Sequence, residues 1–378
     1  MLVWSVAAIA VLTLAGLVAL WPSTVHHKGP SQAFGGPTQT TRVVRVLDTP
    51  CKSPTPQACR QLLVHVGGHP ARITLGPVGS VVDLSAGERI RVSRTVLARG
   101  VPAPPGYEAY QFVDVDRQGA LLELLAAFGI LALLLLWRRG VLAVLGVALS
   151  LLLLITFVVP AILTGEPALL VALVAALAVM FVTLVLTNGV GAQTLAAAIG
   201  ISSTLVLTAL LASLWIGLVH LDGRSGDAAQ YLTEQNASLS LTGVVLAGMI
   251  IGALGVLADT AVTQASAVMA LRRANPSTSA SALYRGALAV GRDHLSATIH
   301  TLVLAYAGVS LPLLLAIRAS GLGFADAVNS QTLAEPIVAT IIGCAALIVA
   351  VPLTTGLASL LVARLPPEAL GAAHTHQH

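Results

Sequence analysis

The chain has 378 residues, of which 56% are hydrophobic and only 10% are charged. Ordinary soluble domains carry roughly a quarter charged residues, so a soluble fold of this size could not cover so much apolar surface. The formal net charge is +4, but the arginines are dispersed along the chain, which excludes a nucleic-acid-binding surface. We therefore expect a polytopic α-helical membrane protein whose main partner is the lipid bilayer.

The first apolar run covers Leu2 to Leu20 and ends at Trp21-Pro22, where an interfacial aromatic residue meets a helix breaker. A cleaved signal peptide would have a basic start and a small-residue cleavage site, and both are missing here. We expect an uncleaved transmembrane anchor at residues 1–22, with a cleaved signal peptide as the alternative. Residues 23–37 are rich in Gly, Pro, His and Ser, which is typical of a linker.

The composition changes between residues 38 and 117, where short β-rich runs alternate with Gly, Pro and Asp turns. The runs are 42–47, 61–66, 71–75, 89–96 and 109–116. This pattern predicts a small β-domain, plausible as a five-stranded barrel, inserted after the first helix. Its simplest role is that of a solvated cap or a docking module.

Cysteine positions give a second indication about this domain. Cys51 and Cys59 lie in its first long loop, whereas Cys344 lies in an apolar run. We expect a disulfide between Cys51 and Cys59 that closes a Pro-rich loop, because paired loop cysteines are typical of an oxidising compartment. A metal site is the alternative, although no second Cys/His pair has suitable spacing.

Seven further apolar runs follow the β-domain, each long enough to cross about 30 Å of hydrocarbon. They are 121–137, 141–163, 168–186, 194–219, 239–258, 296–317 and 337–362. With the anchor they predict about eight transmembrane helices. Seven of these form a bundle over residues 118–364, and residues 365–378 form a disordered tail.

The arginines in the short loops predict the orientation, because Lys and Arg resist translocation. If the amino terminus is inside, the inner loops carry Arg138, Arg139, Arg272, Arg273, Arg285, Arg292 and Arg364. The outer short loops carry only Arg224 and Arg318. The composition also suggests a bacterial source. We therefore expect both termini in the cytoplasm and the β-domain outside the plasma membrane.

The stretch from Gly248 to Pro312 holds the most informative chemistry. Spacings of three or four residues place six small or polar side chains on one helical face: Gly248, Gly252, Gly255, Asp259, Thr263 and Ser266. The Gly-x-x-x-Gly pair predicts close approach of another helix. A single helix from residue 236 to 271 would exceed the bilayer thickness. We therefore expect a bend near residues 255–263, an interfacial segment at 263–273, and a second inner helix at 281–290.

On the returning helix, Asp293, Ser296 and His300 share one face, and Arg292 lies beside them. Asp259 and this turn lie at similar depth from the cytoplasmic edge. Our hypothesis is that Asp259 pairs with Arg292 or His300 and that protonation of the cluster is linked to a conformational change. The alternative is that Asp259 is solvated at the boundary or clamps two helices together. The candidate cluster thus comprises Asp259, Thr263, Arg292, Asp293 and His300.

Other candidate residues are more isolated. Asn188-Gly189 is most simply a turn, with Asn188 as a cavity ligand in the alternative. Glu335 begins the last span, where a helix dipole stabilises a carboxylate or where it could bind an ion. No motif of a metalloprotease, serine hydrolase or nucleotide-driven enzyme is present, so we expect neither an enzyme nor a cofactor.

Three blocks resemble the YibE/F-like family of bacterial multi-pass membrane proteins. They are GALGVLADTAVTQASAVMAL (252–271), GRDHLSATIHTLVLAYAGVSLPLLL (291–315) and AEPIVATIIGCAALIVAVPLTTGLASLL (334–361). The segments TNGVGAQTLAAAIG (187–200) and YQFVDVDRQGALLELLAAFG (110–129) are similar to that family too. The family pattern has Asn in place of His300 and Gly-Thr in place of Ala297-Thr298. The resemblance implies the fold but no settled activity.

Two functions from different classes fit these observations. The first is a transporter or permease, linked to an ion gradient, for a small solute or ion. The second is a non-catalytic scaffold that docks an envelope protein through the β-domain. A water-accessible cavity reaching Asp259 and His300 would favour transport, and a closed core with an exposed apolar patch on the β-domain would favour the scaffold. An intramembrane enzyme is the third and weakest alternative.

Overall fold

The computed structural model describes residues 2–22, 38–51, 57–95, 107–225, 227–235 and 239–364. The linker expected at 23–37 and the tail expected at 365–378 therefore lie outside the described residues. The chain divides into two compact units, one formed by residues 26–131 and the other by residues 1–25 and 132–378. Each unit has its own hydrophobic core.

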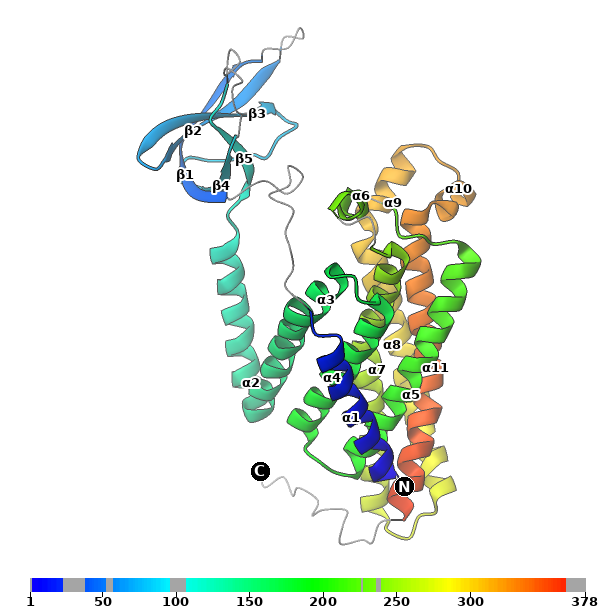
Figure 1. Cartoon of the computed structure of the whole chain (residues 1–378). Helices are drawn as coiled ribbons and strands as arrows, with labels where there is room; N and C mark the ends of the chain where they lie inside the picture. Colours follow the sequence, from blue (N-terminus) through cyan, green and yellow to red (C-terminus); the bar gives the residue numbers. More distant parts are fainter. Residues whose placement is uncertain are drawn as a thin grey trace. The chain divides into compact units, whose positions relative to one another are not determined.

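The smaller unit contains a curled antiparallel sheet of five strands (Figure 1). The strands are β1 (Thr38–Pro50), β2 (Ala58–Val66), β3 (His69–Pro77), β4 (Arg89–Arg94) and β5 (Tyr110–Val115). Their order is β3-β2-β1-β4-β5, and β1 pairs with β4 through its first half and with β2 through its second. The edge strands β3 and β5 come close together, so the five predicted runs do form the strands of one curled sheet.

Alternating side chains build the core of this sheet, as the period of two in a strand requires. The buried residues are Val43, Leu62, Val64, Val66, Ile73, Leu84, Ile90 and Val92. Gly67 and Gly68 join β2 to β3 with φ values of 60° and 84°. Positive φ at both positions is what a two-residue type I′ hairpin needs, and glycine adopts it without strain. This turn fixes the register in which Val66 pairs with His69.

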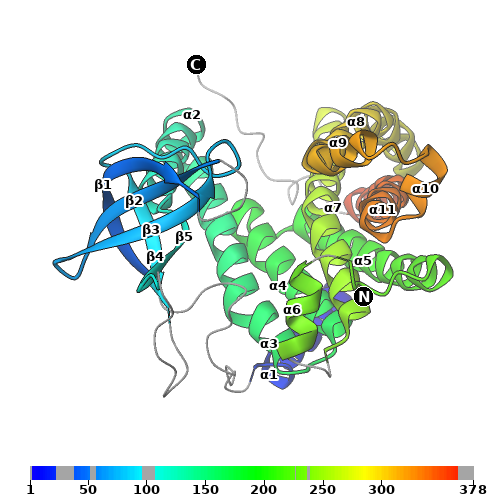
Figure 2. The ribbon, with the colours of Figure 1, turned by 90° about the horizontal axis from the view of Figure 1, so that it is seen from above.

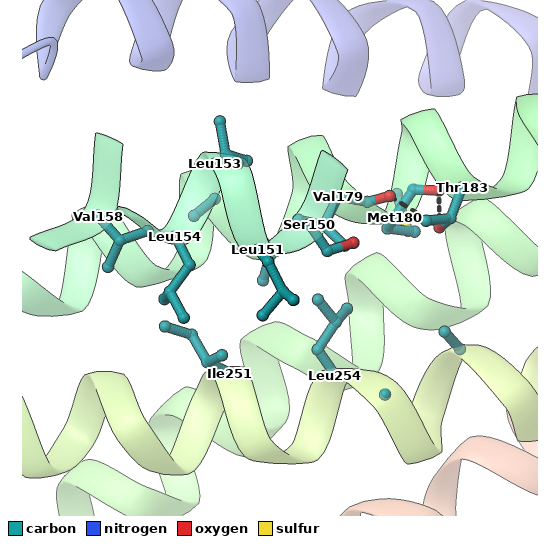
Figure 3. A pocket seen from close by; sticks show the side chains of 14 residues that line it. Ser150, Leu151, Leu153, Leu154, Val158, Val179, Met180, Thr183, Ile251 and Leu254 are labelled. Atoms are coloured by element: carbon teal, nitrogen blue, oxygen red, sulfur yellow. Dashed lines mark hydrogen bonds between the residues drawn. The ribbon is translucent and has the colours of Figure 1, made fainter. Parts of the chain in front are cut away.

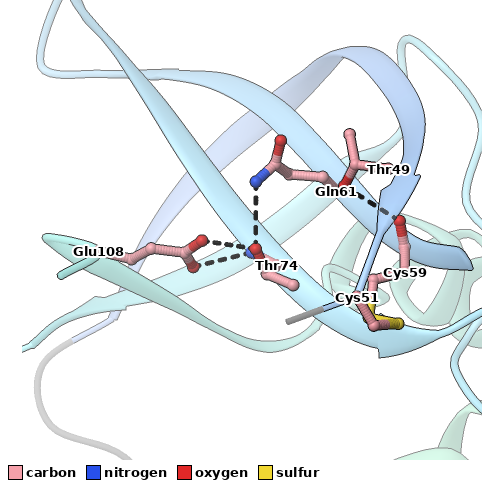
Figure 4. Close-up of a disulfide and its surroundings, with 6 residues drawn as sticks. All are labelled: Thr49, Cys51, Cys59, Gln61, Thr74 and Glu108. Carbon is pink, nitrogen blue, oxygen red and sulfur yellow. Dashed lines mark hydrogen bonds between the residues drawn. A yellow bond between two sulfur atoms is a disulfide. The ribbon is translucent and has the colours of Figure 1, made fainter. Parts of the chain in front are cut away.

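The predicted disulfide between Cys51 and Cys59 is present (Figure 4). It links the end of β1 to the start of β2, beside the register pair formed by Thr49 and Cys59. The backbone N–H of Cys51 also donates to the carbonyl of Gln57 at 2.9 Å. The crosslink thus closes the loop between the two strands.

Helix α2 (Gln118–Leu153) follows β5 and is interrupted at Trp137, whose φ of 50° and ψ of −129° are not helical. The interruption separates two apolar segments, Gln118–Trp137 and Gly140–Leu163. The second segment includes the π-helical turn η1 (Leu154–Val158) and α3 (Val159–Leu163). The runs expected at 121–137 and 141–163 match these two segments.

The larger unit is a helical bundle that begins with α1 (Leu2–Ala19) and contains the second half of α2. Its other helices are α4 (Ala168–Asn188), α5 (Ala192–Val219), α6 (Asp227–Gln235), α7 (Leu241–Ala274), α8 (Ala280–Val309), α9 (Leu311–Ala319), α10 (Phe324–Asn329) and α11 (Gln331–Ala363). In the described chain, six helices are long and apolar enough to cross a membrane, or seven if the α8–α9 pair, bent by 55°, is one span. Helix α1 is apolar but shorter. Eight spans would need both α1 and the bent pair, so that number stays a prediction.

Helices α5, α7 and α11 pack against one another, and α7 lies between α4 and α8 (Figure 2). Small side chains let these backbones approach closely. The alanines among the buried residues of the three helices include Ala196, Ala197, Ala261, Ala265, Ala346 and Ala350. The same interface holds a polar contact, because the hydroxyl of Thr355 lies 2.9 Å from Oε1 of Gln264 and 2.6 Å from the carbonyl of Val351.

Two expectations about the hairpin between α7 and α8 are wrong. Helix α7 runs unbroken from Leu241 to Ala274, with no bend at 255–263 and no separate interfacial segment. Its last turns stay helical because Gln264, Ala265 and Val268 are buried in the bundle core. Likewise α8 is one helix from Ala280 to Val309, so residues 281–290 do not form a separate one. Length alone therefore does not break α7, because its second half remains packed in the core of the bundle.

Candidate functional site

The glycine face of α7, formed by Gly248, Gly252, Gly255 and Asp259, is exposed. An added Cβ atom at Gly248 or Gly255 would have no atom within 4 Å, and one at Gly252 would meet only Oη of Tyr306, at 3.1 Å. The structure therefore differs from the predicted close approach of another helix backbone. The buried face of α7 lies on the side that packs against α5 and α11, and the glycine face is left to line cavities.

A polar cavity of about 690 Å³ lies along the second half of α7. Helix α7 contributes Asp259, Ser266 and Arg273 to its lining, together with apolar residues. The end of α4 and the start of α5 contribute Thr183, Thr187, Asn188 and Gln193. Nε2 of Gln193 donates to Oγ of Ser266 at 2.6 Å, which ties α5 to α7 across the cavity.

The turn between α4 and α5 positions Thr187 and Asn188, which lie at the end of α4. Gly189 adopts a φ of 69°, which ends α4 and allows the chain to reverse. The hydroxyl of Thr194 then donates to the carbonyl of Gly189 at 2.7 Å. Asn188-Gly189 is thus the expected turn, and the side chain of Asn188 also lines the cavity. Its Nδ2 donates to Oγ1 of Thr187 at 2.8 Å.

Asp259 lies beside His294 of α8, with Oδ2 of the carboxylate 3.9 Å from Nε2 of the imidazole. This separation permits an ionic attraction but is too long for a hydrogen bond. The side chain of Asp259 is 71% exposed, so water in the cavity can reach it, whereas that of His294 is 35% exposed. Nε2 of His294 has no hydrogen-bond partner among the described residues.

The expected partners of Asp259 do not join it. Arg292, Asp293 and His300 are exposed, and Nδ1 of His300 lies 2.7 Å from the carbonyl of Ser296 in its own helix. Thr263 is half-buried on α7 and does not line the polar cavity. The structure therefore brings only Asp259, of the five predicted cluster residues, to this cavity.

Helical periodicity explains why His294 faces α7. Leu283, Ala287 and Gly291 are the buried residues of α8, and Gly291 packs against the side chain of Gln264. His294 follows at the next step of this three-to-four-residue spacing, while Arg292 and Asp293 point away. The apolar spacing on α8 was the signal in the sequence that identifies His294.

An apolar cavity of about 380 Å³ adjoins the polar one. Figure 3 shows the side chains that line it. It lies between the second half of α2, α4 and the middle of α7, and Gly255 is part of its lining. Thr183 and Ala258 line both cavities, so the two meet there. The polar site near Asp259 therefore continues into a space lined almost entirely by hydrocarbon.

A third cavity, of about 520 Å³, lies at the other end of α7. Gly248 lines it together with Tyr306 of α8 and Glu335 of α11. Oε2 of Glu335 accepts a hydrogen bond from the hydroxyl of Ser225 at 3.4 Å. A carboxylate thus lies near each end of the glycine face, that of Glu335 near Gly248 and that of Asp259 beyond Gly255.

The polar cavity is lined by one carboxylate, one guanidinium group and several hydroxyl and amide groups. The carboxylate of Asp259 and the surrounding hydroxyl and amide groups offer oxygen atoms to a small cation. The described residues contain no group of three or more His, Cys, Asp or Glu side chains that could hold a metal ion.

The apolar helices and the polar site inside the bundle define a multi-pass membrane protein that carries a separate antiparallel β-domain. Residues 124–364 match the YibE/F-like protein family, and the chain belongs to this family. The match begins within α2 and runs to the end of α11, and it does not include α1 or the β-domain. No curated protein and no solved structure matches the chain significantly.

Proposed function

We propose that the protein is a secondary transporter or permease of the plasma membrane, driven by an ion gradient. The observation that carries this proposal is the polar cavity of about 690 Å³, which reaches an exposed carboxylate on a membrane-spanning helix. Ionisable groups within membrane-spanning segments are costly and commonly mark ion or proton paths. In the predicted orientation the second half of α7, which borders the cavity, lies toward the cytoplasm and the β-domain lies outside.

Asp259 is the group proposed to bind the coupling proton or ion. When Asp259 is ionised, its carboxylate attracts the imidazole of His294 across 3.9 Å, and this contact links α7 to α8. Protonation of the carboxylate removes that attraction. The charge state of Asp259 then biases how closely the two helices pack, which links ion binding to a change in the cavity.

The test is reconstitution in liposomes that contain a pH-sensitive dye, with a panel of metabolites and ions outside. We expect Asp259→Asn to lower solute-linked proton flux at least about tenfold, whereas Asp293→Asn retains it. Asp293 is a matched control because it is an exposed carboxylate of α8 that lines none of the three bundle cavities. Full flux in the Asp259→Asn variant would refute the proposal.

A second function, docking of an envelope protein by the β-domain, has one observation in its favour. A cavity of about 490 Å³ lies where β3 meets the residues before β5, and Gln61, Arg72, Tyr107 and Glu108 line it. Glu108 is fixed there, because its carboxylate accepts from the N–H of Thr74 at 2.8 Å and from its hydroxyl at 2.5 Å (Figure 4).

Photocrosslinking in intact cells tests the docking function. A photoreactive residue at position 72 should give one discrete protein adduct, and the same residue at exposed position 83, which does not line the cavity, should not. If position 72 yields no adduct beyond the level at position 83, the docking function is rejected. Neither of the two proposed functions requires catalysis.

A further inference from the structure

The two adjoining cavities beside α7 differ sharply in chemistry. Leucine, valine, alanine, isoleucine and methionine side chains dominate the lining of the apolar cavity, and its polar side chains are only Ser150 and Thr183. Both hydroxyls donate to carbonyls of their own helices, that of Ser150 to Gly146 at 2.7 Å and that of Thr183 to Val179 at 2.7 Å. The apolar cavity therefore offers a ligand hydrocarbon contacts and few hydrogen bonds.

The polar cavity offers the opposite environment. Asp259, Ser266, Asn188 and Gln193 line it, and they can donate or accept hydrogen bonds or attract a charge. Asp259 directly follows Ala258, which lines both cavities, so its carboxylate lies close to the boundary between them. Arg273 also lines the polar cavity but lies about 21 Å further along α7, at 1.5 Å per residue.

We propose that the transported substrate is an amphiphile with a cationic head, such as an alkylammonium compound. Its hydrocarbon chain lies in the apolar cavity beside Gly255, and its head lies next to Asp259. This inference rests on the transport function proposed above and names the substrate class for the same site.

The charged side chain nearest the boundary determines which charge the head group of the ligand must carry. An ammonium group at the boundary is attracted by the carboxylate of Asp259, whereas a carboxylate or phosphate there is repelled by it. His294 is on α8 and lines neither cavity. The volumes of about 380 Å³ and 690 Å³ fall in the range of roughly 300–1,000 Å³ that is usual for ligand pockets.

Gly255 lines the apolar cavity without a side chain of its own. An added Cβ atom there would have no atom within 4 Å, so a larger side chain can enter the cavity without displacing a neighbouring helix. Gly255→Leu therefore fills the space proposed for the hydrocarbon chain. Gly217→Leu in α5 is the matched control, because Gly217 has equally open surroundings and lines none of the bundle cavities.

The experiment measures binding to the full chain in nanodiscs by calorimetry, with empty nanodiscs subtracted. The probes are dodecyltrimethylammonium below its micelle concentration, dodecanoate with the same chain length, and tetramethylammonium with the head alone. We expect the long-chain cation to bind more tightly than either other probe. Gly255→Leu should weaken its binding about tenfold, by the contacts of a few buried methylene groups, and leave tetramethylammonium binding unchanged. Retained tetramethylammonium binding also shows that the variant is folded.

Two results would overturn the inference. One is that the long-chain cation binds no more tightly than tetramethylammonium. The other is that Gly255→Leu and Gly217→Leu bind it equally, which would mean that bilayer lipid alone fills the apolar cavity. The liposome flux assay separates this failure from failure of transport: Asp259-dependent flux of a water-soluble solute would leave the transport function standing and reject only the amphiphile.

Discussion

Replacing Gly200 with alanine tests the packing of α5 against α11 most directly. A Cβ atom at position 200 would lie 2.3 Å from Oγ1 and 3.1 Å from Cβ of Thr354. Both residues are buried, and Cβ of Thr354 is fixed to its backbone, so a rotamer change alone cannot relieve the contact. The two helices must move apart.

The expected magnitude follows from comparison with Gly217→Ala in the same helix, where an added Cβ atom would have no atom within 4 Å. The gain in helix propensity from glycine to alanine, about 1 kcal/mol, is common to both substitutions and cancels in the comparison. Overpacking of a buried contact costs about 1–3 kcal/mol. We therefore expect Gly200→Ala to be less stable than Gly217→Ala by about 1–3 kcal/mol.

The assay is the free energy of unfolding, obtained by titrating SDS into mixed micelles and following the loss of helix by circular dichroism. The double variant Gly200→Ala/Thr354→Ala should recover most of the loss, because it removes the atoms that clash. Oγ1 of Thr354 has no hydrogen-bond partner among the described residues, so its removal costs little. Equal stability of Gly200→Ala and Gly217→Ala would refute this account of the interface.

Three further predictions concern other parts of the chain. Reducing the disulfide between Cys51 and Cys59, which are 8 residues apart in the sequence, should destabilise the β-domain by about 2–3 kcal/mol. Amide hydrogen exchange in the β-domain should then become faster, and unchanged exchange would contradict the prediction. The hydrogen bond from Arg117, together with that from the N–H of Val115, lowers the pKa of Asp114 in the folded protein. The ionised Asp114 therefore stabilises the fold above its unfolded-state pKa of about 3.9, and this contribution is lost as the pH falls through the lower folded-state pKa. Carboxyl NMR titration should show this pKa rising in Arg117→Gln. Gln264→Met should unfold at equal or higher SDS concentration, because Nε2 of Gln264 is buried without a partner. Clear destabilisation would contradict this and show that the contact of Oε1 with Thr355 outweighs the cost of the unpaired Nε2.

Features that depend on local patterns were predicted from the sequence. The five β-rich runs became strands, the paired loop cysteines became a disulfide, and the runs at 168–186 and 194–219 became α4 and α5. The end of α7 at Ala274, before Asn275-Pro276, also follows from local chemistry, since the residue before a proline disfavours helix. Hydropathy and turn residues act over a few positions and are therefore visible in one sequence.

Features that depend on packing were not predicted. Asp259 faces His294 rather than Arg292 or His300, because the rotation of α8 is fixed where Gly291 meets Gln264. Counting residues back from the hairpin on both helices predicts that Asp259 lies beside the 292–300 turn, but this count carries no information about the rotation of either helix. The glycine face also failed as a predictor of helix contact, since small residues suit both a close helix and an open cavity. Only the positions of the neighbouring helices decide between these outcomes.

The unbroken course of α7 has a mechanical consequence. A helix of 34 residues, about 51 Å long, is a stiff rod that borders the Glu335 cavity with its first turns and the polar cavity with its second half, from Ala258 to Arg273. If such a rod pivots near its middle, its ends move in opposite directions, so a tilt that narrows one cavity widens the other. The glycines near the pivot leave room for the tilt. An interrupted helix, as first expected from the sequence, would not transmit that motion from one end to the other.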